Sequence, residues 1–325
     1  MARASRRTFL TATAAAGLVA SGLFSTSAVA AEPISVVATT GMIADVAREI
    51  GGDAVSVKAL MGPGVDPHAY RQTRTDIVAM AQADLVLWNG LYLEAQMEDF
   101  LGDLGDRTSV VAVAEAVAPD SLVAHDDYDD RFDPHVWMNP TLWSDVVLAT
   151  RDAMIDVSPD HADTFTAAAD AYLAEVDAVG TYATQVLASV PETARVLISA
   201  HDAFNYFGEA YGFDVVGIQG ISTESEAGLA RIRDLVDMLV ERDVRAFFVE
   251  SSVSDRSVKA LIEGAEARGH EVTIGGELYS DAMGAPGTYE GTYIGMIDHN
   301  ATTIATALGG EAPARGLNNR LNAGS

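Results

Sequence analysis

Cysteine is absent from the 325 residues of this chain. Without thiols we expect no disulfide, no thiolate metal site, no cysteine nucleophile and no lipid anchor on a cysteine behind a leader. Histidine is also sparse, with seven residues. Any site built from imidazoles must therefore draw on a small and countable set of side chains.

Basic residues are scarce as well. Lys and Arg number 20 against 47 Asp and Glu, which gives a formal net charge of −27. Such a field repels nucleic acid and anionic lipid, so we expect neither as a partner. The charge is compatible with attraction of cations toward a site, and equally with a solvated acidic surface that keeps the protein soluble.

One long apolar run occurs, and it lies in residues 1–30. Arg3, Arg6 and Arg7 precede a small-residue apolar stretch that ends in Ala28-Val29-Ala30. This order is typical of a cleaved secretory signal peptide, and the paired arginines also fit a twin-arginine signal, so Sec and twin-arginine export both stay open. We expect a mature protein free in the periplasm, without a lipid anchor.

Beyond residue 30, short β-branched runs alternate with amphipathic stretches, which predicts βα units around mainly parallel sheets. Strands are predicted at 34–40, 55–60, 83–90, 109–117, 194–200, 213–219, 244–251 and 270–276. The fold class is therefore α/β, with two similar halves.

A long helix is predicted between the halves, over residues 158–190. Ser158 suits the N-cap and Pro159 the first helical position. A helix of this length is a rod of about 45 Å, which resists large hinge motions. The expected division is a signal peptide at 1–30, an N-terminal lobe at 31–157, the connecting helix at 158–190 and a C-terminal lobe at 191–325. The Gly- and Asn-rich tail from 309 is predicted to be disordered.

Two of the histidines lie in the same short frame. Residues 65–70 read VDPHAY and residues 132–137 read FDPHVW, so His68 and His135 each follow Asp-Pro. Proline fixes its own φ and keeps the preceding residue out of the helical region, which holds the next imidazole on a stiff backbone. A metal ligand benefits from that stiffness. The Asp carboxylate can accept a hydrogen bond from a loop amide or from the second imidazole nitrogen.

His201 follows a predicted strand directly, and ligand sites of open α/β sheets lie beyond the carboxyl ends of the strands. Three imidazoles leave the charge of a divalent ion unbalanced, so a carboxylate is the expected fourth ligand. Asp281 is our choice, although spacing alone leaves Glu277 and Glu250 comparable.

The remaining histidines fit other roles. His161, His270 and His299 are predicted to be surface or packing residues. His125 begins an acidic loop up to residue 133, which either concentrates cations or is simply solvated.

Several longer motifs make the chain resemble the solute-binding proteins of ABC importers for zinc and manganese, the TroA-, ZnuA- and PsaA-like family. The resemblance spans nearly the whole chain after the leader and rests on GVDPHAY, ADLVLWNGLYLE, DPHVWMNP, ISAHDAFNYFGEAYGF, GIQGISTESEAG, FFVESSVSDRSVKALIEGAEARGHEV and GGELYSDAMGAPGTYEGTYIGMIDHN. It implies two α/β lobes joined by one rigid helix, with a single metal ion in the cleft. It also implies that the ligands are His68, His135, His201 and Asp281, and so selects Asp281 over its rivals.

The resemblance leaves the metal open. Manganese members related to streptococcal adhesins carry Glu at the third position, where this chain has His201, whereas zinc members often carry a long His-rich loop that is here short and acidic. Mn²⁺ is slightly favoured, Zn²⁺ is close behind, and Fe²⁺ is a third candidate.

The implied partner is a membrane permease, to which a monomeric protein delivers the ion. The competing hypothesis is a zinc metallohydrolase. The chain has no HExxH helix, no GxSxG elbow, no phosphate loop and no obvious general base, so we expect no enzyme. A surface adhesin is a weaker alternative, because the chain shows no repeat or low-complexity segment to support it.

Overall fold

The computed structural model describes residue 1, residues 32–125, residue 128 and residues 130–322. The expected signal peptide and residues 126, 127 and 129 of the acidic loop lie outside the described residues. From Pro33 onward the chain forms one compact unit. None of the helices in the described part has the length and apolarity of a membrane span.

The N-terminal lobe is built on a four-stranded parallel sheet in the order β2-β1-β3-β4. Its strands and helices are β1 (Ile34–Ala38), α1 (Gly41–Gly51), β2 (Val55–Ala59), α2 (Arg74–Gln82), β3 (Leu85–Trp88), α3 (Glu98–Gly105), β4 (Ser109–Ala112) and α4 (Pro140–Val157). Thr40 caps α1 by accepting a hydrogen bond from the amide of Ile43, and Asn139 caps α4 ahead of Pro140. The predicted alternation of strands and helices is confirmed here.

The C-terminal lobe contains two pairs of parallel strands, β5-β6 and β7-β8, with β5 packed next to β7. Its elements are β5 (Val196–Ser199), α6 (Asn205–Tyr211), β6 (Asp214–Gly217), α7 (Leu229–Glu241), β7 (Ala246–Glu250), α8 (Arg256–Glu266), β8 (Thr273–Leu278) and α9 (Tyr293–Ala307). The strand expected at 270–276 begins and ends later, at Thr273–Leu278, and its pairing with β7 shifts register between Phe247 and Phe248.

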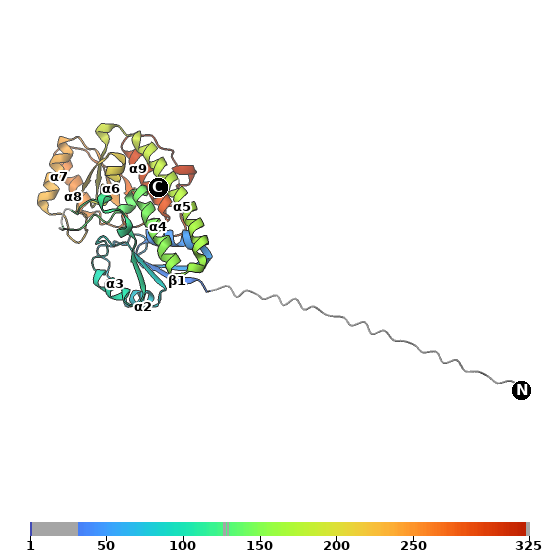
Figure 1. Ribbon diagram of the computed structural model, residues 1–325. Coiled ribbons are helices and arrows are strands. Elements are labelled where there is room, and N and C mark those ends of the chain that lie inside the picture. The colour runs from blue at the N-terminus through green and yellow to red at the C-terminus, as the bar shows by residue number, and fades with distance from the viewer. Residues whose placement is uncertain (2–31, 126–127, 129, 323–325) are drawn as a thin grey trace. The chain divides into compact units, whose positions relative to one another are not determined.

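Short 3₁₀ turns lie between the helices and strands at Gly52–Ala54, Val113–Ala116, Pro119–Ser121, Val136–Met138, Pro159–His161 and Glu192–Ala194, and one more follows the last helix at Leu317–Asn319. In Figure 1, α2 and α3 lie at the bottom of the compact unit, and α7 and α8 lie at its left side.

The long helix α5 (Ala162–Ala188) packs against α4, α9 and α1. It begins later than predicted, because Ser158 bonds the ring of His161 at 2.8 Å and does not cap the helix, while Pro159–His161 form a 3₁₀ turn. Gly180 has a packing reason: a Cβ there would lie 3.2 Å from Cβ of Pro140. The helix is therefore packed against the rest of the fold and is not a free linker.

One apolar core runs through both lobes. It joins residues of β1, α1, α4 and α5 to residues of α6 and α9. Within it, Trp143 of α4 stacks on Tyr293 of α9 with ring centroids 5.0 Å apart. Parting the lobes widely would expose this surface to water, so we expect small movements between them.

The described part of the C-terminal tail is folded, so the prediction of disorder is wrong up to residue 322. The amide of Leu317 donates to Asp298 at 2.9 Å, and Asn322 donates to Glu290. Leu321 is buried. Buried carboxylates on α9 and on the preceding loop need donors, and the tail supplies them.

Candidate metal centre

Three histidines and one aspartate meet at the carboxyl ends of the strands. His68 lies in the loop between β2 and α2, and His135 lies just before α4. His201 follows β5, and Asp281 follows β8. In the part of the chain that the structure describes, these four form the one group of histidines and acids whose possible ligand atoms all lie within 4.8 Å of one another.

The potential ligand atoms converge on one point. Nε2 of His135 lies 3.2 Å from Nε2 of His68 and 3.3 Å from Nε2 of His201. The oxygens of Asp281 lie 3.4 Å from Nε2 of His135 and 3.2 Å from Nε2 of His201. Nε2 of His68 is further from Asp281, at 4.0 Å. All four side chains are buried.

Asp133 fixes the orientation of His135. One oxygen of its carboxylate, Oδ1, lies 2.9 Å from the amide nitrogen of His135 and 2.6 Å from ring atom Nδ1. Nδ1 therefore carries the donated proton, so that in the neutral ring the lone pair of Nε2 faces the cluster. The Asp of an Asp-Pro-His frame was expected to accept from a loop amide or from the ring, and Asp133 does both.

Glu250, at the end of β7, does the same for His201. Its Oε1 accepts from the amide of His201 at 2.8 Å, and its Oε2 lies 2.5 Å from Nδ1. Glu250 is thus a partner of a histidine, one step removed from the cluster. Glu277, the other rival of Asp281, is exposed on β8.

A second support lies beneath His135. The amide side chain of Asn89, at the end of β3, donates to the carbonyl of Pro134 at 3.2 Å. Buried Glu94 accepts from the amide of Asn89 at 2.9 Å and from the hydroxyl of Thr39 at 2.6 Å. These bonds hold the Asp-Pro-His loop on the edge of the sheet.

Burial and neighbouring charges move the pKa values of the three histidines in different directions. Burial lowers the pKa of His68 to about 3. Burial also acts to lower the pKa of His135, but Asp133 and Asp281 outweigh it and raise this pKa to about 9. The pKa of His201 is raised well above its usual value in the same way, because Asp281 and Glu250 outweigh burial.

The carboxylate of Asp281 is buried against the imidazoles. Burial opposes its ionisation, yet the charges of His201 and His135 hold its pKa well below the usual range. Both of its oxygens are buried, and neither makes a hydrogen bond. The charges of His201 and His135 are protons on the two imidazoles. Metal binding requires neutral imidazoles, so a bound metal ion would take the place of those protons as the cation beside this buried carboxylate.

The donor set fits a divalent transition metal. Four ligands placed tetrahedrally at zinc distances lie about 3.3 Å apart, close to the shorter separations described above. Two of the three imidazoles are oriented by carboxylates, as is usual for metal-bound histidines. Asp281 also turns both oxygens toward the imidazoles, so a fifth donor is at hand for an ion that prefers a higher coordination number.

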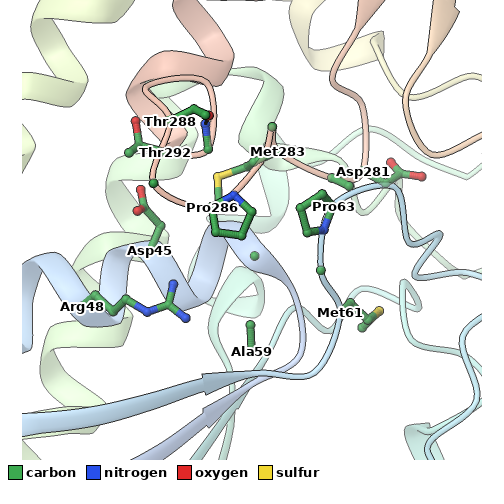
Figure 2. A pocket seen from close by; sticks show the side chains of 16 residues that line it. Asp45, Arg48, Ala59, Met61, Pro63, Asp281, Met283, Pro286, Thr288 and Thr292 are labelled. Carbon is green, nitrogen blue, oxygen red and sulfur yellow. Dashed lines mark hydrogen bonds between the residues drawn. The ribbon is translucent and has the colours of Figure 1, made fainter.

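A cavity of about 590 Å³ adjoins the cluster, and Asp281 is among the residues that line it. Met61 and Pro63 line it from the loop before His68, and Met283 and Pro286 line it from the loop after Asp281. Figure 2 shows the carboxylate of Asp281 pointing away from these residues. The side-chain cluster therefore lies on the other side of the Asp281 loop.

The other histidines do not join the cluster. Ring atoms of His270 and His299 bond the backbone carbonyls of Val244 and Glu277, at 2.7 and 2.9 Å, and His161 bonds Ser158. His125 packs on Tyr128, with centroids 4.7 Å apart. The roles of Glu250 and Asn89 were missed from the sequence, and their positions at strand ends are the signal that pointed toward them.

Comparison with known proteins now decides the family. Residues 36–307 match the model of the family described as ZnuA, zinc-uptake complex component A, periplasmic. The chain belongs to this family. Its fold is that of the family too: it superposes on the periplasmic zinc-binding protein TroA of Treponema pallidum with a TM-score of 0.83, 44% identity, and coverage of 85% of this chain and 99% of TroA.

Relatives of this chain are named for zinc, as TroA is, for manganese, or for a metal that is not specified. The manganese-binding lipoprotein MntA of Bacillus subtilis is 46% identical over 303 residues, covering 90% of this chain and 99% of MntA. The metal ABC transporter substrate-binding lipoprotein SsaB of Streptococcus sanguinis is 28% identical over 283 residues, covering 85% of this chain and 89% of SsaB. Family membership therefore leaves the metal of this chain open.

Proposed function

We propose that this protein captures one divalent transition metal ion between its lobes and delivers it to the permease of an ABC importer. The ligands in this proposal are His68, His135, His201 and Asp281. The observation that carries it is the buried carboxylate of Asp281, whose oxygens make no hydrogen bond and lie 3.2, 3.4 and 4.0 Å from the Nε2 atoms of His201, His135 and His68. The ion is the transported cargo.

Mn²⁺ is the slightly favoured cargo and Zn²⁺ the close second. Both oxygens of Asp281 face the imidazoles, which offers manganese a fifth donor, while the short separations also suit tetrahedral zinc. The relatives MntA and TroA, named for manganese and zinc, are 46% and 44% identical to this chain and do not separate the two. Fe²⁺ suits the same donors.

The alternative of a zinc hydrolase is disfavoured by the fourth side chain. A catalytic zinc keeps one position open for water, whereas Asp281 fills it here. We infer that the protein is no enzyme.

We also propose that the mature chain works outside the cytoplasm, as a monomer and without a lipid anchor. The relatives MntA and SsaB are named lipoproteins. This chain has no cysteine to carry a lipid, so the proposed leader would release it as a free protein. Radiolabelled palmitate in cells that produce the protein tests this, since incorporation into the mature chain would contradict it.

Calorimetric titration of the chelator-stripped mature protein with Mn²⁺ at pH 7.5 tests the main proposal. We expect sub-micromolar binding of one ion, which the double variant His68→Ala, Asp281→Ala loses. The variant Glu277→Ala is the matched control, because it removes an exposed carboxylate outside the cluster. Weak manganese binding together with tight zinc binding would reassign the cargo to zinc. A double variant that still binds both metals as the wild type does would contradict the assignment of the site.

A further inference from the structure

The two Asp-Pro-His frames share a second feature. In each frame, Oδ1 of the Asp carboxylate accepts from the amide of the histidine two residues later, at 2.9 Å for Asp66 with His68 and at 2.9 Å for Asp133 with His135. One oxygen of each Asp is thus committed to the backbone of its own histidine.

The other oxygen of each carboxylate is bound from the opposite lobe. The hydroxyl of Thr223, in the loop between β6 and α7, donates to Oδ2 of Asp66 at 2.6 Å. The side-chain amide of Asn205, the first residue of α6, donates to Oδ2 of Asp133 at 3.0 Å. Both Asp residues therefore bridge a histidine of the N-terminal lobe to a polar side chain of the C-terminal lobe.

We propose that Thr223 and Asn205 are positioning residues that hold the two lobes together around the ion and set how fast it leaves. Their two hydrogen bonds, from Thr223 to Asp66 and from Asn205 to Asp133, are called the clasp below. This rests on the proposed function, because it concerns retention of the same ion. His68 and His135 come from one lobe, and His201 and Asp281 come from the other. The ion cannot leave until these pairs part, and parting them breaks both bonds to Asp66 and Asp133.

Close packing around the clasp supports its role. Gly64, in the loop that leads to Asp66, has φ +69°, and a Cβ there would lie 3.3 Å from the backbone oxygen of Ser251 in the other lobe. The His68 loop thus meets the C-terminal lobe at two points. Near the second frame, the hydroxyl of Tyr206 donates to the backbone oxygen of Asp133 at 2.8 Å.

The two hydrogen bonds of the clasp differ in how deeply their residues are buried. Asp133 is fully buried, with 0% of its surface exposed, whereas Asp66 and Thr223 are partly accessible. A hydrogen bond to a charged group in a partly accessible place separates more readily than a buried one. We therefore expect the Thr223 bond to open first and to limit the early stage of release.

The test measures release directly. Protein loaded with Zn²⁺ is mixed in a stopped-flow instrument with an excess of a chromogenic zinc chelator, and the dissociation rate is read from the absorbance. Zn²⁺ is the probe because it binds strongly to almost any nitrogen and oxygen site, whichever metal is the natural cargo. Thr223→Val removes the hydroxyl while keeping the shape, and Thr223→Ser keeps the hydroxyl.

We expect Thr223→Val to release zinc about tenfold faster, from the loss of one charge-assisted hydrogen bond in a partly accessible place. Thr223→Ser should release it within about twofold of the wild type. The Co²⁺ absorption spectrum of both variants should match the wild type, because none of the four ligands changes. Asn205→Ala gives an independent second arm and should also release zinc faster.

The outcomes separate the clasp from the function itself. A wild type that fails to bind one Zn²⁺ would overturn the proposed function. A wild type that binds normally, with wild-type release from both Thr223→Val and Asn205→Ala, would overturn the clasp alone. An altered Co²⁺ spectrum in Thr223→Val would also overturn it, because the residue would then act on the coordination geometry.

Discussion

Replacing Glu250 with glutamine is predicted to weaken metal binding without touching a ligand. Glu250 accepts two hydrogen bonds from His201, one from the amide and one from Nδ1, and it is only 4% exposed. Glutamine has the same shape but one oxygen and one NH₂ group. Whichever way the amide is turned, its NH₂ group faces a donor of His201.

The magnitude follows from the lost bond. If the NH₂ group faces the ring, the proton of His201 moves from Nδ1 to Nε2, where it blocks the lone pair that binds the ion. A hydrogen bond to a charged group contributes about 1.5–3 kcal/mol, which corresponds to a roughly 10- to 100-fold loss of affinity. Loss of a partner that orients a metal-bound histidine typically has an effect of about the same size.

The assay is competition for Zn²⁺ against a chelator of known affinity at pH 7.5, for the wild type, Glu250→Gln and Glu277→Gln. Glu277 lies on the neighbouring strand β8 and is exposed, so its variant should bind like the wild type. Circular dichroism and thermal unfolding establish that each variant is folded. A folded Glu250→Gln that binds zinc within twofold of the wild type would refute the reasoning.

Two further predictions concern pH. The pKa of His135 is raised to about 9, so a proton competes with the ion up to that pH. The affinity for Mn²⁺ should therefore still rise between pH 7 and 8.5. Calorimetry that shows no gain in affinity above pH 7 would contradict this. Burial raises the pKa of Asp45 from 3.8 to about 6, so the folded state holds more protons than the unfolded state in that window, and stability is lost as pH rises through it. In urea unfolding, the free energy of unfolding of Asp45→Asn should therefore gain about 3 kcal/mol relative to the wild type between pH 4 and pH 7. Equal pH dependence of the wild type and Asp45→Asn would count against the burial of this charge.

Much of the fold was predictable because its signals are local. The β-branched runs mark the strands, and Pro after each Asp marks the two stiff loops that carry His68 and His135. His201 was predictable from its place at a strand end. These residues need no knowledge of distant parts of the chain.

Other features depend on contacts between distant segments. Spacing did not separate Asp281 from Glu250 and Glu277, because the choice depends on which acid the folded chain turns toward the imidazoles. The resemblance to the family selected Asp281, and the structure places it in the cluster. The order of the tail likewise depends on the buried carboxylates that it reaches, such as Asp298.

The donors of the clasp were beyond prediction for the same reason. Thr223 and Asn205 lie 157 and 72 residues from the carboxylates they bind. Nothing in the periodicity around either residue marks it as a partner of Asp66 or Asp133. Such pairs become visible only when both lobes are in place.

X-ray absorption spectroscopy of protein loaded with one equivalent of Zn²⁺ tests the central claim most directly, because it counts the atoms bound to the ion. We predict three imidazole nitrogens and one or two carboxylate oxygens at about 2.0–2.2 Å. In His68→Ala the number of imidazole nitrogens bound to the ion should fall from three to two. A wild-type spectrum with fewer than three imidazoles, or one unchanged in His68→Ala, would contradict the assignment of the metal centre.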